Sequence, residues 1–251
     1  MKTILIFATS MLIAAFTFAQ NRDVEEVKVT APQFTGIVNA TLSQTESANL
    51  LIRNYLKENV VYPEKAQECR LEGTEVVQFT VTAEGNVADF KIINSVCTLI
   101  DEEIIGVLRG TDGMWLPGYN NGNPVDMTKE VSMVFCLDNG TNKPTHEIFT
   151  EKATSYFSNG NKNLYEKHNV KKAMKFYSSG INYLPYDQSL FLMRGMCRYE
   201  LGDETGAHDD WNRIEDTGKI ALSEFTAQLE ETKGYNVFKA SLQFQKFFSV
   251  L

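Results

Sequence analysis

The chain has 251 residues and a net charge of −8 at pH 7, with 24 basic against 32 acidic side chains. A nucleic-acid-binding protein normally carries a basic stripe, so this balance argues against that class of partner. Hydrophobic residues make up 43% of the chain, which is enough for packed cores. The length predicts one or two domains.

The first 19 residues predict a secretory signal peptide. Lys2 precedes an apolar run from Ile4 to Phe18, and the small residues Thr17 and Ala19 stand where a signal peptidase cleaves. We therefore expect an exported chain that begins at Gln20 and has no membrane span after cleavage. The alternative is an uncleaved anchor, but the run is at the short end of what crosses a bilayer.

Helix and strand patterns alternate over the next hundred residues. Ser43 and Glu46 have the spacing of a capping box, and an apolar helical face follows until Pro63 forces an end near Asn59. Two alternating runs around Gly85 predict an antiparallel hairpin over 75–94. Helical spacing returns over 99–108, a Gly- and Pro-rich turn region follows, and 129–137 alternates again. We expect Val131, Met133, Phe135 and Leu137 to face the core, and an α+β domain with a three-stranded antiparallel sheet.

The second half repeats with a period of 34 residues. Three pairs show this spacing: Phe157 and Phe191, Ala173 and Ala207, Tyr177 and Trp211. With Gly195 and Gly202, the second unit resembles a tetratricopeptide repeat; the first unit is weaker, because its Gly160 stands one place off. Residues 145–251 are therefore predicted to be all-α, with the tail 220–251 as a cap.

Four residues of these repeats are candidates for lining a groove that holds a second protein partner: Tyr165, Leu192, Met196 and Tyr199. The alternative is that they form the core between repeats. A two-repeat groove is shallow, so the two interpretations are nearly equal.

Eight short motifs follow one another along the first half of the chain: Pro32-x-Phe34-x-Gly36, Tyr62-Pro63, Ala66, Glu72-Gly73, Glu84-Gly85-Asn86-Val87, Leu99–Glu103, Trp115–Gly118 and Asn121–Val125. With these motifs in this order, residues 30–138 resemble the C-terminal domain of TonB, of the type found in Bacteroidetes. Two departures are Cys97-Thr98 before the second helix and the glycines of 106–113.

The resemblance implies a fold and a partner. It implies a domain over 20–140 that docks an extended peptide of an outer-membrane transporter by strand addition, in the periplasm. The implied docking residues are Asn59, Val60, Val61, Val131, Ser132, Met133, Val134 and Phe135. The alternative is an envelope scaffold or assembly protein that does not bind transporters.

The sequence contains no recognisable catalytic, cofactor or metal motif. His146, His168 and His208 lack ligand spacing, and the acidic run beside His208 is more typical of a solvated helix face. Cys69, Cys97 and Cys136 leave two possibilities open, a disulfide between two of them or free thiols. Trp115 is interpreted as a core residue rather than a stacking platform. We therefore expect a protein-binding module and not an enzyme.

Overall fold

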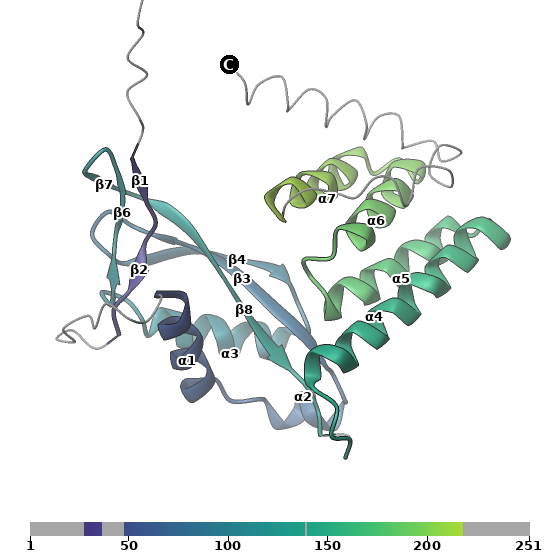
Figure 1. Ribbon diagram of the computed structural model, residues 1–251, viewed down its shortest axis with the longest axis horizontal. Helices are drawn as coiled ribbons and strands as arrows, with labels where there is room; N and C mark the ends of the chain where they lie inside the picture. Colours follow the sequence, from purple (N-terminus) through teal and green to yellow (C-terminus); the bar gives the residue numbers. More distant parts are fainter. Residues whose placement is uncertain (1–27, 37–47, 139, 218–251) are drawn as a thin grey trace, which may run out of the picture.

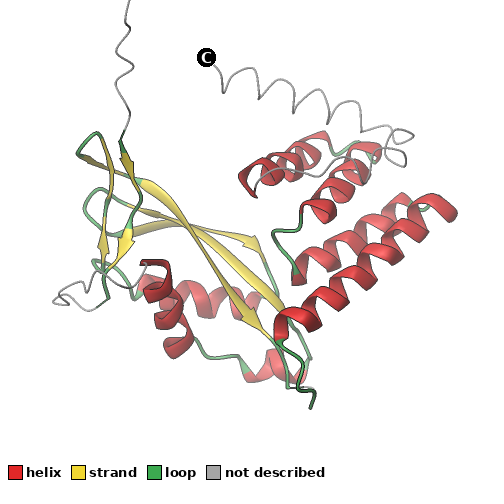
Figure 2. Ribbon diagram, in the orientation of Figure 1, coloured by secondary structure: helices red, strands yellow, loops and turns green. Residues whose placement is uncertain are grey.

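The computed structural model describes residues 28–36, 48–138 and 140–217. Strands and three helices form one part, here called the sheet half (residues 28–138), and helices alone form the other, the helical half (residues 140–217) (Figures 1 and 2). This is the predicted order, α+β followed by all-α. The predicted signal peptide, the capping box at Ser43 and the tail 220–251 lie outside the described residues.

A three-stranded antiparallel sheet is the frame of the sheet half. Its order is β4-β3-β8, and its strands span Gly73–Val81 (β3), Val87–Asn94 (β4) and Met127–Phe135 (β8). One face packs on the helices Ala48–Asn59 (α1) and Thr98–Arg109 (α3). The five-residue helix Glu64–Glu68 (α2) leads into β3. The apolar alternation read along each strand therefore does face a common core.

The expected turn region between α3 and β8 contains short strands that hold the N-terminal segment. Val29–Thr30 (β1) pairs with Gly118–Asn120 (β6), which pairs with Asn123–Val125 (β7), and Gln33–Phe34 (β2) pairs with Trp115–Leu116 (β5). Trp115 is 4% exposed and packs on Phe34 and Phe79, and its ring N–H donates to Thr111 Oγ1 at 2.9 Å. Its interpretation as a core residue is confirmed.

The helical half consists of paired helices in sequence order. They span Thr145–Asn161 (α4), the π-helical turn Lys162–Glu166 (η1), Val170–Tyr183 (α5), Gln188–Glu200 (α6) and Glu204–Thr217 (α7). Asn169 and Asp187 cap α5 and α6 by accepting from the backbone N–H of Lys172 and Leu190. No described helix is long and apolar enough to cross a membrane.

The π-helical turn explains why Gly160 stands one place off the repeat. A side chain at Gly160 would overlap the ring of Tyr177, and one at Gly195 would overlap the ring of Trp211. The two glycines therefore occupy equivalent places under equivalent aromatic rings. The spacing from glycine to ring is one residue longer in the first pair, and a π-turn accommodates one extra residue in a helix.

The groove prediction is wrong for two of its four residues. Leu192 and Met196 are both 0% exposed and belong to the core cluster of the helical half. Helices α5 and α7 pack on both sides of α6, so its apolar residues are enclosed. Tyr165 and Tyr199 pack against the same cluster but are only partly buried.

Candidate functional site

The free edge of β8 is the candidate docking site. All nine residues of β8 pair with β3 in one unbroken register, from Met127 opposite Val81 to Phe135 opposite Gly73. Because β8 is last in the order β4-β3-β8, no strand among the described residues pairs with its other side. Its backbone groups on that side are available to an added strand.

Side chains alternate along β8 as the sequence predicted for Val131, Met133 and Phe135, whereas the half-buried Leu137 lies beyond the end of the strand. Val131 and Phe135 are 7% and 2% exposed, and Met133 packs against the same core. Ser132 and Val134 are exposed on the opposite face, Val134 to 48%. An added strand would continue this alternation, with one set of side chains over the helices and the other on the outer face.

The opposite edge of the sheet is less suited to pairing. Strand β4 has one more residue than β3 at two places, between Asn94 and Ile92 and between Lys91 and Ala88. Asp89, inside the second bulge, has φ of +51°. Bulges interrupt the regular spacing of backbone donors and acceptors and thereby protect an edge from further pairing. The regular strand β8 is therefore the better template.

The segment Asn59–Val61 lies close to the C-terminal end of β8. The next residue, Tyr62, packs edge-on against Phe135 with ring centroids 5.1 Å apart. Val61 is 68% exposed, but its N–H already donates to Glu103 Oε1 at 2.9 Å, and Val60 is 9% exposed. This segment can contribute the Val61 side chain and Asn59 to a docked peptide, but not the Val61 N–H.

The outer face of the sheet contacts the helical half, which the sequence analysis did not foresee. Glu130 on β8 accepts from both terminal nitrogens of Arg213 at 2.7 and 2.8 Å and from the Tyr186 hydroxyl at 2.9 Å. The Arg213 guanidinium also lies over the Tyr186 ring, 5.6 Å from its centroid. Charged, bidentate bonds of this kind hold a defined geometry. No periodicity within one element could reveal this contact between positions 83 apart.

A second set of contacts joins the halves at the start of β3. Lys152 pairs with Glu72 and lies 5.1 Å from the centroid of the Tyr183 ring. Thr74 Oγ1 donates to the Tyr183 carbonyl at 2.9 Å. A side chain at Gly73 would approach the Asn182 carbonyl oxygen to 2.8 Å, so the close approach of the two backbones requires glycine there. These contacts at Glu72–Thr74 and those of Glu130 are here called the seam between the two halves. Each half contributes particular side chains to it.

The pKa values of several seam groups are shifted. Burial, together with the charge of Glu130, raises the pKa of Tyr186 to about 12. The bonds from Lys152 and the Leu137 N–H outweigh burial and lower the pKa of Glu72. Both shifts favour the protonation states that the seam contacts need at neutral pH, a neutral Tyr186 donor and a charged Glu72.

The polar groups inside the helical half serve its packing. Asp210 is 2% exposed and accepts from Arg194 at 2.6 to 3.2 Å and from Arg198 at 2.8 Å. His208, beside it in sequence, packs its ring edge-on against Trp211 at 5.4 Å. No cluster of three metal-ligating side chains occurs within the described ranges. Asp210 alone of the acidic run therefore holds two arginines in place; the expected solvated face is right for the exposed Asp209 and wrong for the buried Asp210.

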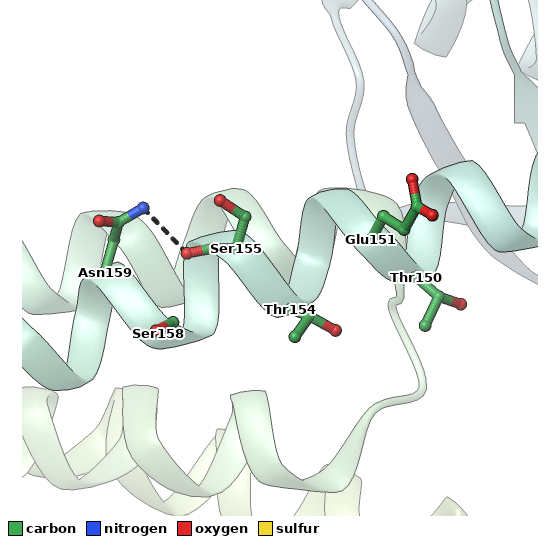
Figure 3. Close-up of a pocket in the computed structure, with 6 residues that line it drawn as sticks. All are labelled: Thr150, Glu151, Thr154, Ser155, Ser158 and Asn159. Carbon is green, nitrogen blue, oxygen red and sulfur yellow. Dashed lines mark hydrogen bonds between the residues drawn. The ribbon is translucent and has the colours of Figure 1, made fainter.

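A pocket of about 600 Å³ lies along α4 and is lined by residues with polar side chains (Figure 3). It is lined by Thr150, Glu151, Thr154, Ser155, Ser158 and Asn159. Asn159 Nδ2 donates to the Ser155 carbonyl at 2.9 Å, and Glu151 pairs with Lys143 at 2.5 Å. None of these hydroxyls is paired with a base in the described structure, so the pocket shows no nucleophile arrangement.

Glu75 is the one fully buried carboxyl of β3. It is 0% exposed; one oxygen accepts from the Val96 N–H at 2.8 Å and the other has no hydrogen-bond partner among the described residues. Burial, with a smaller contribution from the nearby Asp101, raises the pKa of Glu75 to about 8. The side chain therefore keeps its proton at pH 7 and lies in the core beside Val96 and Asp101, on the β3 residue that pairs with Met133 of β8.

The four cysteines, all within the described residues, are free. Cys69 is exposed, Cys97 and Cys136 are half-buried, and Cys197 is buried. Burial raises the pKa of the Cys197 thiol to about 12 and also raises that of Cys136. Neither thiol has the depressed pKa of a nucleophile.

Comparisons with known proteins found a family model that matches most of the sheet half. Residues 58–137 match the family model for the Gram-negative bacterial TonB protein C-terminal. This segment holds β3, β4, β8 and α3, and thus the whole candidate docking strand. The match covers less than half of the chain and does not include the helical half. A search of curated proteins found no match.

Two solution structures of the TonB C-terminal domain of Helicobacter pylori are also similar to this chain. The one of residues 194–285 is 20% identical, with 36% of this chain and 94% of that chain covered and a TM-score of 0.29. The one of residues 179–285 is 18% identical, with 40% and 98% covered and a TM-score of 0.30.

Proposed function

We propose that this protein is a TonB-type docking protein of the cell envelope, which adds an extended segment of an outer-membrane transporter to the free edge of β8. The regular, unbroken edge of β8 inside a segment that matches the TonB family model is the observation that carries the proposal. In strand addition, backbone hydrogen bonds supply affinity and pockets for alternate side chains supply specificity.

The proposal includes an exported chain and a second partner. Cleavage after Ala19 leaves a mature N-terminus at Gln20, which N-terminal sequencing of periplasmic protein would detect; an intact Met1 in the inner membrane would contradict it. The helical half is proposed to be tetratricopeptide-like and to bind another protein through side chains. Tyr165 and Tyr199 are its remaining candidates, since both are only partly buried.

Proline substitutions along β8 test the docking edge. Backbone N–H groups of successive strand residues point to opposite sides, and proline removes one of them. Ser132→Pro and Val134→Pro therefore remove N–H groups from one side of β8, and Met133→Pro removes an N–H group from the other side. Variants that lose an N–H on the open edge should lose binding and keep the fold. Variants that lose an N–H bonded to β3 should lose the fold.

The measurement is the affinity of the full chain for peptides copied from the periplasm-facing plug segments of outer-membrane transporters, together with thermal melting of each variant. A result in which every folded proline variant binds like the parent protein excludes strand addition at β8. If the parent chain binds no plug segment but captures another envelope protein, the scaffold alternative is the better interpretation.

A further inference from the structure

Three cations on β8 and on the helix α1 have no carboxylate partner among the described residues. They are Lys129 on β8 and Arg53 and Lys57 on α1. None of them takes part in an ion pair within the described part of the chain, although its acidic residues outnumber its basic ones. Within the described ranges, the bond of Lys129 Nζ is to an amide: it donates to Asn49 Oδ1 at 2.7 Å.

The Lys129 bond places α1 beneath β8. Asn49 stands at the start of α1 and Lys129 near the start of β8, while Tyr62, just beyond α1, packs on Phe135 at the end of β8. Helix and strand therefore run in the same direction, with α1 under the edge strand. In contrast, α3 packs against β3 and β4, farther from that edge.

The rotation of α1 about its own axis determines which of its sides lies under the open edge. Tyr55 packs on Phe34, with ring centroids 5.3 Å apart, and its hydroxyl lies near Gly110 at the end of α3. Residues two positions away on a helix point to nearly the opposite side. Arg53 and Lys57, both exposed, therefore lie on the side away from α3. They follow Asn49 at intervals of four residues, so they share the side of α1 whose Asn49 bonds to Lys129 on β8.

We infer that the strand docked on β8 is acidic, with carboxylate side chains on its core-facing side directed at Lys129, Arg53 and Lys57. This inference rests on the proposed strand addition and names the chemistry of its partner. Burial lowers the pKa of Lys129, so a half-buried ammonium with a single amide partner gains from an incoming carboxylate. The contact of the carboxylates with the cations also determines which face of the added strand points toward the helices. The opposite face of the added strand then lies on the outer side of the sheet.

Designed peptides of about ten residues test the charge preference, since this length, at the upper end of the usual range for strands, is enough to pair with all nine residues of β8. Thr alternates with Glu in the first, with Gln in the second and with Lys in the third. Binding to the full chain is measured at low and high salt. We expect the Glu peptide to bind best and to weaken as salt rises, because exposed charges are screened.

Charge-removing variants assign the preference to α1. The double variant Arg53→Gln with Lys57→Gln should weaken the Glu peptide by about threefold to tenfold and leave the Gln peptide unchanged. Lys91→Gln, on the opposite edge strand β4, removes a charge from an equally exposed lysine and should have no effect.

Three outcomes would overturn the acidic preference: equal binding of Glu and Gln peptides, equal loss in the Lys91→Gln variant, or no binding of any designed peptide. Strand addition itself is judged separately, by the plug segments and the proline variants. If those show the expected register and the Glu preference is absent, only the charge inference fails.

Discussion

The two halves of the protein satisfy their backbone hydrogen bonds in different ways. The helical half closes its bonds within each helix and joins its helices through side chains, such as the rings that cover Gly160 and Gly195. The sheet half closes them between strands far apart in sequence and leaves one edge of β8 without a described partner strand. Only the sheet half can therefore recognise a partner through its backbone, and the helical half must do so through side chains.

The chain carries a reporter for each half, which makes the comparison measurable. It has two tryptophans, Trp115 in the core of the sheet half and Trp211 in that of the helical half. Trp115→Phe leaves a fluorescence signal from the helical half alone, and Trp211→Phe leaves one from the sheet half. Each variant below is measured in the background that keeps the tryptophan of its own half, and Glu130→Ala, which affects both halves, is measured in both backgrounds.

The largest effect is expected from Asp210→Ala. It leaves Arg194 and Arg198 without the buried carboxylate that both contact, and breaking such a pair costs about 3 kcal/mol or more. The Trp211 signal should report a strongly destabilised helical half, with docking on β8 retained. The matched control is Asp209→Ala at the exposed neighbouring position. An equal loss in both variants would contradict the role given to Asp210.

Glycine substitutions should have opposite signs in the two halves. Gly195→Ala would overlap the Trp211 ring and should destabilise the helical half by about 1–3 kcal/mol. Gly106→Ala lies in α3 with nothing within 4 Å of the new methyl group, so it should stabilise the sheet half by about 0.5–1 kcal/mol. Chemical denaturation measures both. Stabilisation by Gly195→Ala would show that the ring does not need the glycine.

Removing the seam charge should have a moderate effect. Glu130→Ala takes away the acceptor of Arg213 and Tyr186 and should cost about 1–2 kcal/mol. The unfolding transitions of the two tryptophan signals should then separate. Thr128→Ala, at an exposed position on the same face of β8, is the control.

Separability of the halves is checked by limited proteolysis. Residues 21–140 and 145–251 are predicted to fold independently, with cleavage between 139 and 144. If truncating either half abolished the folding of the other, the halves would form one cooperative unit. The seam contacts would then be required for both.

The smallest effect is expected from Glu75→Gln near pH 4.5, and this effect should grow as the pH rises. The folded protein keeps the Glu75 proton up to about pH 8, whereas the unfolded chain releases it near its ordinary pKa of 4.5. The folded state therefore binds more protons in this interval, and its stability falls as pH rises from about 4.5 to about 8. Glu75→Gln should flatten this slope in urea denaturation, and Glu84→Gln in an exposed turn should not. An unchanged slope would contradict the buried, neutral carboxyl.

Local patterns in the sequence determined the elements and their faces. A period of two placed Val131 and Phe135 inward and Ser132 and Val134 outward, because successive strand residues point to opposite sides. Pro63 marked the end of α1 because its ring cannot continue a helix. The motifs of 62–125 also indicated the family model that residues 58–137 match, since turns and close approaches restrict residue type at fixed positions.

Only the tertiary structure decided what these faces meet. Helical spacing marks Leu192 and Met196 as apolar but does not say whether a neighbouring helix covers them, and two helices do. The seam of Glu130 with Arg213, the bulges that protect β4 and the cations beneath β8 depend on how separate elements pack. Such contacts join residues far apart in the chain, and a periodicity within one element carries no information about its partner in another.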